Sequence, residues 1–171
     1  MSNPTDRTDP TTVGAAVVTV SSTLSLENDE TGAAIVTAFE TAGHEIVTRE
    51  LIQRGYDNVQ STVSRLVDRT DADIVVTVGG TGVEPQDMTL EAVRPLLDKE
   101  LPAFLDLFHA ISYEELGTGV VSSRALGGVS EGVPIFCLPN DRDAVGIACE
   151  SIIVPEAQRL ATLASSDTDE E

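Results

Sequence analysis

The chain has 171 residues, of which 41% are hydrophobic and only 4% aromatic, so it is long enough for one domain with a core of aliphatic side chains. Its 29 acidic and 10 basic residues give a formal net charge of −19, which argues against nucleic acid and anionic membranes as partners. All basic residues except Lys99 are arginines, and this acid-rich, lysine-poor composition predicts a halophilic origin.

The first half of the chain alternates short β-branched runs with amphipathic stretches. Strands are predicted at 13–20, 45–51 and 73–78. Helices are predicted at 31–42 and at 57–67, where Asp57 is the expected N-cap. Because these strands are almost continuously apolar and alternate with helices, they predict a parallel sheet covered on both faces.

The second half is less regular in its apolar pattern. Together with the first half, it predicts a three-layer α/β/α domain with about five mostly parallel strands and room for one antiparallel strand. The predicted elements are helices at 90–97 and 103–112, strands at 123–130 and 134–138, and a closing helix over 141–163 with a break or kink at Pro155.

The domain is predicted to span residues 13–163, with polar tails at 1–12 and 164–171. No apolar signal segment precedes residue 13, and no apolar run approaches the ~20 residues needed to span a bilayer. These features predict a cytoplasmic location. Cys137 and Cys149 lie in apolar sequence without metal-site spacing, and we expect buried, reduced thiols.

A glycine-rich loop directly follows the predicted strand at 73–78. In open α/β sheets, ligands bind at the carboxyl ends of the strands, and Gly79, Gly80, Thr81 and Gly82 lie at such an end. Glycines allow backbone N–H groups to converge on a phosphate, although the same residues also suit a tight turn that needs positive φ.

Asp87 follows this loop, just before a predicted helix for which Thr89 is the expected N-cap. One interpretation is an acid that favours a helix N-terminus. The other is a hard oxygen ligand for Mg²⁺ beside the phosphate.

Two further loops leave strand ends at the same predicted edge. The loop at 21–32 offers hydroxyl groups, among them that of Ser21, and a run of acids. The loop that begins with Pro139 and Asn140 opens the closing helix. All three loops are therefore candidates for lining one ligand site.

Several motifs taken together resemble one known family. The chain is similar to the molybdenum cofactor biosynthesis family of MogA and MoaB, which is related to the G domain of gephyrin. The tyrosine–glutamate stretch at 112–118 is closer to the MoaB branch. The motifs that carry the resemblance are TVGGTGVEPQDMTLE at 77–91, RPLL at 94–97, SYEELGT at 112–118, SRA at 123–125, LENDETG at 26–32 and AGHE at 42–45.

The resemblance implies a molybdopterin-binding α/β fold that forms homotrimers or homohexamers. It also implies transfer of AMP from Mg-ATP to the terminal phosphate of molybdopterin, with release of pyrophosphate. In this reaction residues 79–82 would hold nucleotide phosphate and Asp87 would hold Mg²⁺ as the catalytic residue. The other implied nucleotide- or molybdopterin-binding residues are Ser21, Ser123, Arg124, Pro139 and Asn140.

Three departures from the family pattern leave alternatives open. Gln53-Arg54-Gly55 stands where active members carry an acidic stretch, and Ser21-Ser22 lacks the usual carboxylate or amide. Asn140 replaces a turn glycine, and we expect it to adopt the left-handed conformation. The leading hypothesis is a molybdopterin adenylyltransferase, the alternative is a non-catalytic molybdopterin-binding or carrier protein, and a third is an oligomeric scaffold without a ligand.

Overall fold

A computed structural model describes residues 12–166 of the chain. Their strands form one six-stranded sheet in the order β2-β1-β3-β6-β5-β4. The strands are β1 (Gly14–Val20), β2 (Glu45–Ile52), β3 (Ile74–Val78), β4 (Lys99–Glu100), β5 (Leu126–Ser130) and β6 (Val133–Leu138). The α-helices are α1 (Glu30–Thr41), α2 (Tyr56–Val67), α3 (Thr89–Val93), α4 (Pro102–Leu116), α5 (Arg142–Ala148) and α6 (Val154–Ala164).

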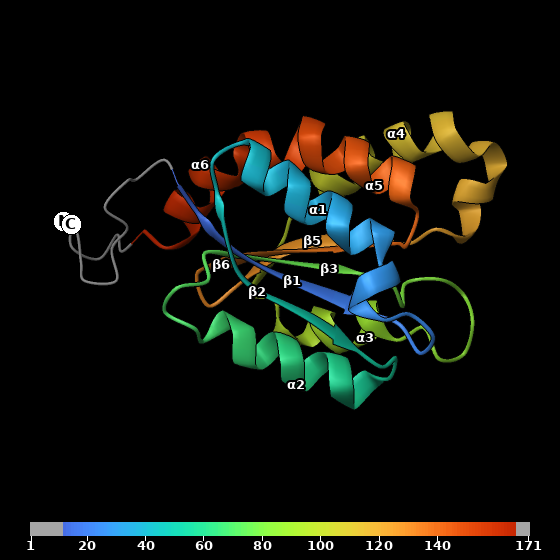
Figure 1. Ribbon diagram of the computed structural model, residues 1–171, viewed down its shortest axis with the longest axis horizontal. Helices are drawn as coiled ribbons and strands as arrows, with labels where there is room; N and C mark the ends of the chain where they lie inside the picture. Colours follow the sequence, from blue (N-terminus) through green and yellow to red (C-terminus); the bar gives the residue numbers. More distant parts are fainter. Residues whose placement is uncertain (1–11, 167–171) are drawn as a thin grey trace.

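Helices cover both faces of the sheet, which confirms the three-layer prediction. Helices α1, α4, α5 and α6 lie on one face, and α2 and α3 lie on the other (Figure 1). The side chains of β1 alternate between these layers, as the two-residue repeat of a strand requires. Ala15 and Val17 pack in the core cluster with α1, whereas Ala16 and Val18 pack in the cluster with α2.

The carboxyl ends of four strands meet at one edge of the sheet. Strands β2, β1, β3 and β6 are parallel, whereas β5 pairs antiparallel with β6 and β4 pairs antiparallel with β5. Leu126 at the start of β5 pairs with Cys137 near the end of β6. Ser123 and Arg124, just before β5, are therefore delivered to the edge where the parallel strands end.

Several predicted boundaries need correction. Helix α2 begins at Tyr56 with Gly55 as its N-cap residue, so Asp57 lies in the first turn. The strand predicted from residue 123 begins only at Leu126, and α4 continues to Leu116, beyond the predicted end at residue 112. The sheet has six strands rather than about five, and only β5 runs opposite to the others, which confirms the prediction of one antiparallel strand.

The predicted closing helix is continuous but contains a π-helical segment. Helix α5 passes through a π-helix at Cys149–Ile153 into α6, where Pro155 is the second residue. A proline lacks the N–H for an α-helical bond and its ring crowds the carbonyl one turn earlier. The π-helical segment ends just before Pro155, so the irregularity predicted at this proline takes the form of a π turn within an uninterrupted helical segment.

Within residues 12–166, no helix combines the length and apolar character needed to cross a bilayer. Both cysteines are buried and free, as predicted. The predicted tails at 1–12 and 164–171 fall largely outside the described residues, and the domain limits stay a prediction.

Candidate functional site

The glycine loop, residues 79–82, turns sharply away from the end of β3. Gly79 has a φ of 102° and Gly80 a φ of 72°, a region that favours glycine. A Cβ on Gly79 would lie 2.2 Å from the carbonyl oxygen of Val20, and one on Gly80 would lie 2.3 Å from the Oγ1 of Thr89. Both glycines are therefore required by positive φ and by close packing against the end of β1 and the start of α3.

Thr89 fixes the loop from the side of α3. Its Oγ1 donates to the carbonyl oxygen of Gly79 at 3.0 Å, and its backbone N–H donates to that of Gly80 at 3.0 Å. Thr89 is the first residue of α3, and Met88 holds the N-cap position, which corrects the expectation that Thr89 is the cap. The Thr89 hydroxyl donates to the glycine loop instead of capping the helix.

The loop presents donors that the described part of the protein does not use. Among residues 12–166, the backbone N–H groups of Gly80, Thr81 and Gly82 donate no hydrogen bond. The Thr81 side chain is buried and its hydroxyl also has no partner there. Buried polar groups are normally paired, so an anion that accepts from these donors fits the loop.

Arg124 holds the outer side of the loop. Its Nε donates to the carbonyl oxygens of Thr81 at 2.9 Å and Gly82 at 3.2 Å, and its Nη2 donates to that of Asp87 at 3.2 Å. Its guanidinium also forms a two-pronged ion pair with Glu91, at 2.7 and 3.2 Å. Arg124 therefore positions the loop.

This ion pair shifts the pKa values of both its partners. The hydrogen bonds with Arg124 lower the pKa of Glu91, and those with Glu91 raise the pKa of Arg124. Ser123, the preceding residue, has a buried hydroxyl without a partner in residues 12–166. Arg124 therefore contacts the glycine loop directly, whereas the hydroxyl of the neighbouring Ser123 has no partner among the described residues.

Asp87 lies at the end of the same loop region, with its side chain only 10% exposed. Its Oδ2 accepts from the backbone N–H of Glu84 at 3.1 Å, and its Oδ1 accepts from Nη1 of Arg54 at 3.3 Å. No group of three or more His, Cys, Asp or Glu side chains suited to a metal occurs in the described region. As placed, these residues do not fit a resident Mg²⁺, because the cationic guanidinium of Arg54 lies 3.3 Å from Oδ1 of Asp87, where a metal ion would bind.

Ser21 lies at the same edge, after β1. Its Oγ accepts from the backbone N–H groups of Thr23 at 3.1 Å and Leu24 at 3.0 Å. This bonding closes a tight turn, and the Ser21 hydroxyl also lies 3.5 Å from the Oγ1 of Thr23, a contact in which either hydroxyl can donate.

The loop after β6 forms without the expected left-handed residue. Among the described residues only Glu131 is a non-glycine with positive φ, so the prediction for Asn140 is wrong. The backbone N–H of Asp141 donates to the carbonyl oxygen of Pro139 at 2.9 Å, which closes a three-residue turn. The Oδ1 of Asn140 is engaged with the Oγ1 of Thr31 at 2.5 Å, which ties this loop to the start of α1.

Asp29 is an important residue of this edge that the sequence motifs did not single out. It caps α1 by accepting from the N–H of Gly32 at 3.0 Å, accepts from the hydroxyl of Thr19 at 2.5 Å, and pairs with Arg49 at 3.3 Å. The carboxylate is fully buried. The sequence signal that could have identified it is an aspartate just before a predicted helix, the position of an N-cap residue whose side chain accepts from the N–H three residues later.

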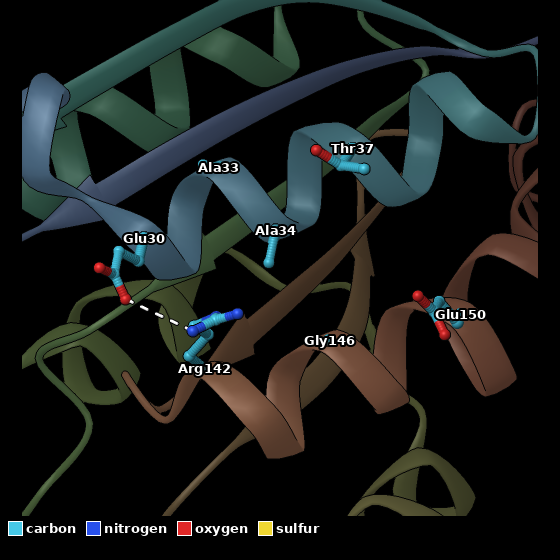
Figure 2. Close-up of a pocket in the computed structure, with 7 residues that line it drawn as sticks. All are labelled: Glu30, Ala33, Ala34, Thr37, Arg142, Gly146 and Glu150. Carbon is cyan, nitrogen blue, oxygen red and sulfur yellow. Dashed lines mark ion pairs between the residues drawn. The ribbon is translucent and has the colours of Figure 1, made fainter.

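A groove between α1 and α5 lies apart from the glycine loop and shares no residue with it (Figure 2). It has a volume of about 470 Å³. At one end Glu30 and Arg142 form an ion pair at 3.6 Å. The groove is lined by Glu30, Ala33, Ala34, Thr37, Arg142, Gly146 and Glu150.

The chain is similar to known proteins over most of its length. Residues 16–159 match the family described as "Probable molybdopterin binding domain". Molybdenum cofactor biosynthesis protein B of Halalkalibacterium halodurans is 37% identical over 148 residues, which cover 86% of this chain and 87% of that protein.

Two solved structures extend this likeness to the fold. A crystal structure of molybdenum cofactor biosynthesis protein B has a TM-score of 0.87 and 34% identity, and the match covers 91% of this chain and 98% of that one. The tungsten cofactor synthesizing protein MoaB from Pyrococcus furiosus has a TM-score of 0.78 and 33% identity, with coverage of 91% and 98%.

Proposed function

Because the chain belongs to the family of probable molybdopterin-binding domains that includes the MoaB proteins, we propose that it acts in molybdenum cofactor biosynthesis. The pterin ligand of this proposal carries a phosphate. The observation that supports it most directly is the glycine loop, whose three consecutive N–H groups and buried Thr81 hydroxyl have no hydrogen-bond partner within residues 12–166 and suit a phosphate group.

The proposed reaction is adenylylation of molybdopterin by ATP. An oxygen of the terminal phosphate of molybdopterin forms a bond to the α-phosphorus of ATP, the bond between the α-phosphorus and the bridging oxygen breaks, and pyrophosphate leaves. ATP brings its magnesium ion as part of the substrate. Because the attacking oxygen belongs to molybdopterin, the protein needs no nucleophile of its own, and positioning and charge stabilisation supply the rate.

Each residue of the edge has a proposed role in this reaction. The N–H groups of the glycine loop and the hydroxyl of Ser123 bind phosphate oxygens. Arg124 keeps the loop in shape through contacts that engage four of its five N–H groups, and the fifth is its proposed contact to the ligand. Ser21 offers its hydroxyl, and Pro139 and Asn140 shape the opposite wall of the site. Asp87 is the proposed catalytic carboxylate, and it would contact the magnesium ion brought by ATP by displacing Arg54 from its Oδ1.

A non-catalytic molybdopterin-binding or carrier protein is the second candidate. The specific observation in its favour is the ion pair between Arg54 and Asp87, which occupies the one carboxylate assigned to magnesium. A carrier predicts molybdopterin binding in calorimetry without any pyrophosphate release from added ATP.

We also propose that the chain assembles into homotrimers or homohexamers. Helix α4 and the 3₁₀ segment Gly117–Ser122 present large apolar side chains to solvent, among them Leu107, Tyr113 and Val121. Exposed apolar groups gathered on neighbouring elements are typical of contact surfaces. Light scattering at low and high KCl tests this assembly, and a monomer at both would contradict it.

Thr81→Val tests the binding site with little change in shape. Because the Thr81 hydroxyl has no partner in the described structure, its loss should leave stability unchanged or slightly raised, while molybdopterin and ATP bind about tenfold more weakly. Thr19→Val is the matched control, since it removes a hydroxyl that donates to buried Asp29 and should lower stability.

Activity is measured as pyrophosphate release with ATP, Mg²⁺ and molybdopterin in KCl, with Asp87→Asn as the second variant. Loss of release in Asp87→Asn with retained molybdopterin binding supports the enzyme. Unchanged binding in Thr81→Val would refute the assignment of the glycine loop.

A further inference from the structure

Arg54 lies in a cluster of oxygen atoms from the segment that follows the glycine loop. Its Nη1 bonds to Oε1 of Glu84 at 3.0 Å and to Oδ1 of Asp87 at 3.3 Å, and its Nη2 bonds to Oε1 of Gln86 at 2.9 Å. Two carboxylates therefore meet at one guanidinium nitrogen. Carboxylate and amide oxygens are also the ligands that Mg²⁺ and Mn²⁺ prefer.

The topology of the sheet explains how this side chain arrives. Arg54 follows β2, the 84–87 segment follows β3, and β1 lies between these strands in the sheet. The guanidinium must therefore cross the carboxyl end of β1 to reach the loop. Gly55, with a φ of 134°, turns the chain into α2 immediately afterwards.

We propose that the guanidinium of Arg54 takes the place of a divalent cation at Asp87, so that the 84–87 segment is held in its site conformation without a metal. Mg²⁺ then reaches Asp87 only in competition with Arg54. The inference rests on the proposed function in treating this segment as part of a magnesium-nucleotide site. Arg54 is thus a positioning residue that sets how strongly the protein itself binds the metal.

The electrostatics favour a cation at this point in every state. Without Arg54, the carboxylates of Glu84 and Asp87 would face each other with no cation between them, in a protein of net charge −19. Their repulsion is strongest for the poorly exposed Asp87, where water screens least. Removing the guanidinium should therefore recruit a metal ion to these carboxylates.

Binding of Mn²⁺ to the protein alone tests the proposal, with free Mn²⁺ followed by electron paramagnetic resonance. Wild type should bind Mn²⁺ weakly, and Arg54→Gln should bind one equivalent about tenfold more tightly. Arg54→Lys keeps the positive charge but not the planar set of guanidinium donors, so its Mn²⁺ affinity should lie between those of wild type and Arg54→Gln.

Arg65→Gln is the matched control. It removes the same charge and frees Glu50, which Arg65 contacts at 2.6 Å, but leaves the 84–87 segment intact. It therefore corrects for nonspecific attraction of Mn²⁺ to the more acidic surface. The double variant Arg54→Gln/Asp87→Asn should lose the gain in affinity.

Equal Mn²⁺ affinities of Arg54→Gln and Arg65→Gln would overturn the proposal, as would tight binding by wild type that Asp87→Asn abolishes. Circular dichroism checks that each variant is folded, and the lysine variant supplies the comparison if the glutamine variant unfolds. No ATP or molybdopterin enters this measurement. A negative result for adenylyl transfer therefore leaves the Mn²⁺ result standing, and the two failures are distinguishable.

Discussion

Replacement of Arg124 by methionine should loosen the glycine loop more than loss of its ion pair alone. Arg124→Met keeps the aliphatic stem but removes the donors to three backbone carbonyls, those of Thr81, Gly82 and Asp87. Glu91→Gln removes the charge partner and leaves those three carbonyl contacts in place. The comparison separates the clamp on the loop from the ion pair.

The expected magnitudes follow from burial. A hydrogen bond from a charged donor contributes about 1.5–3 kcal/mol when buried, but Arg124 is 34% exposed, which reduces each carbonyl contact to about 1 kcal/mol. Arg124→Met should therefore lower the free energy of unfolding by about 2–3 kcal/mol. Glu91, with 39% exposure, should contribute less than about 1 kcal/mol through its ion pair.

Urea unfolding followed by far-ultraviolet circular dichroism measures both variants, since the chain has no Trp and urea, unlike guanidinium chloride, does not screen charge. Calorimetry with ATP reports the loop itself, and Arg124→Met should weaken binding by about tenfold or more. Equal losses of stability in the two variants would refute the reasoning, because the carbonyl contacts would then contribute nothing.

Two further predictions concern the same loop. Gly79→Ala should lower the free energy of unfolding by about 3 kcal/mol or more, because its φ is positive and its Cβ would meet a backbone oxygen at 2.2 Å. Gly146→Ala in α5, where a Cβ meets nothing within 4 Å, should instead stabilise by about 0.5–1 kcal/mol, and equal effects in urea unfolding would contradict the steric argument. The hydrogen bonds with Arg124 lower the pKa of Glu91 in the folded protein below its ordinary value of 4.5. The ion pair therefore contributes its full stability at pH values above 4.5, and this contribution is lost as the pH falls through the lowered pKa. The stability difference between wild type and Glu91→Gln should therefore be present at neutral pH and vanish in acid, and a constant difference in urea titrations would argue against the pair.

The main strands and helices were predictable because their patterns are local. Runs such as 73–78 are apolar at every position, and the helix at 31–42 shows a clear apolar face. The two-residue strand β4 has no room for a pattern, so it could not be predicted. At Pro155 the sequence predicted an irregularity of the helix but not its form, because it does not reveal that a π turn precedes the proline.

The candidate site was predictable in part for the same reason. The glycine loop is a local motif, and its position after a buried strand indicates its place at the edge of the sheet. The partners of Arg124 and Arg54 were not predictable, because they lie about 30–43 residues away and depend on the strand order. The αL prediction for Asn140 was wrong because a tighter turn satisfies the same connection.

Both long-range contacts place an arginine against the glycine loop and its continuation, one from each side. Arg124 approaches along antiparallel β5, and Arg54 approaches from β2 across the end of β1. In a chain with almost three acidic residues for every basic one, the surrounding carboxylates would repel an anion that binds at the glycine loop. The two guanidiniums offset that repulsion where the free N–H groups lie, and because arginine remains charged at any working pH, they do so without requiring a bound metal.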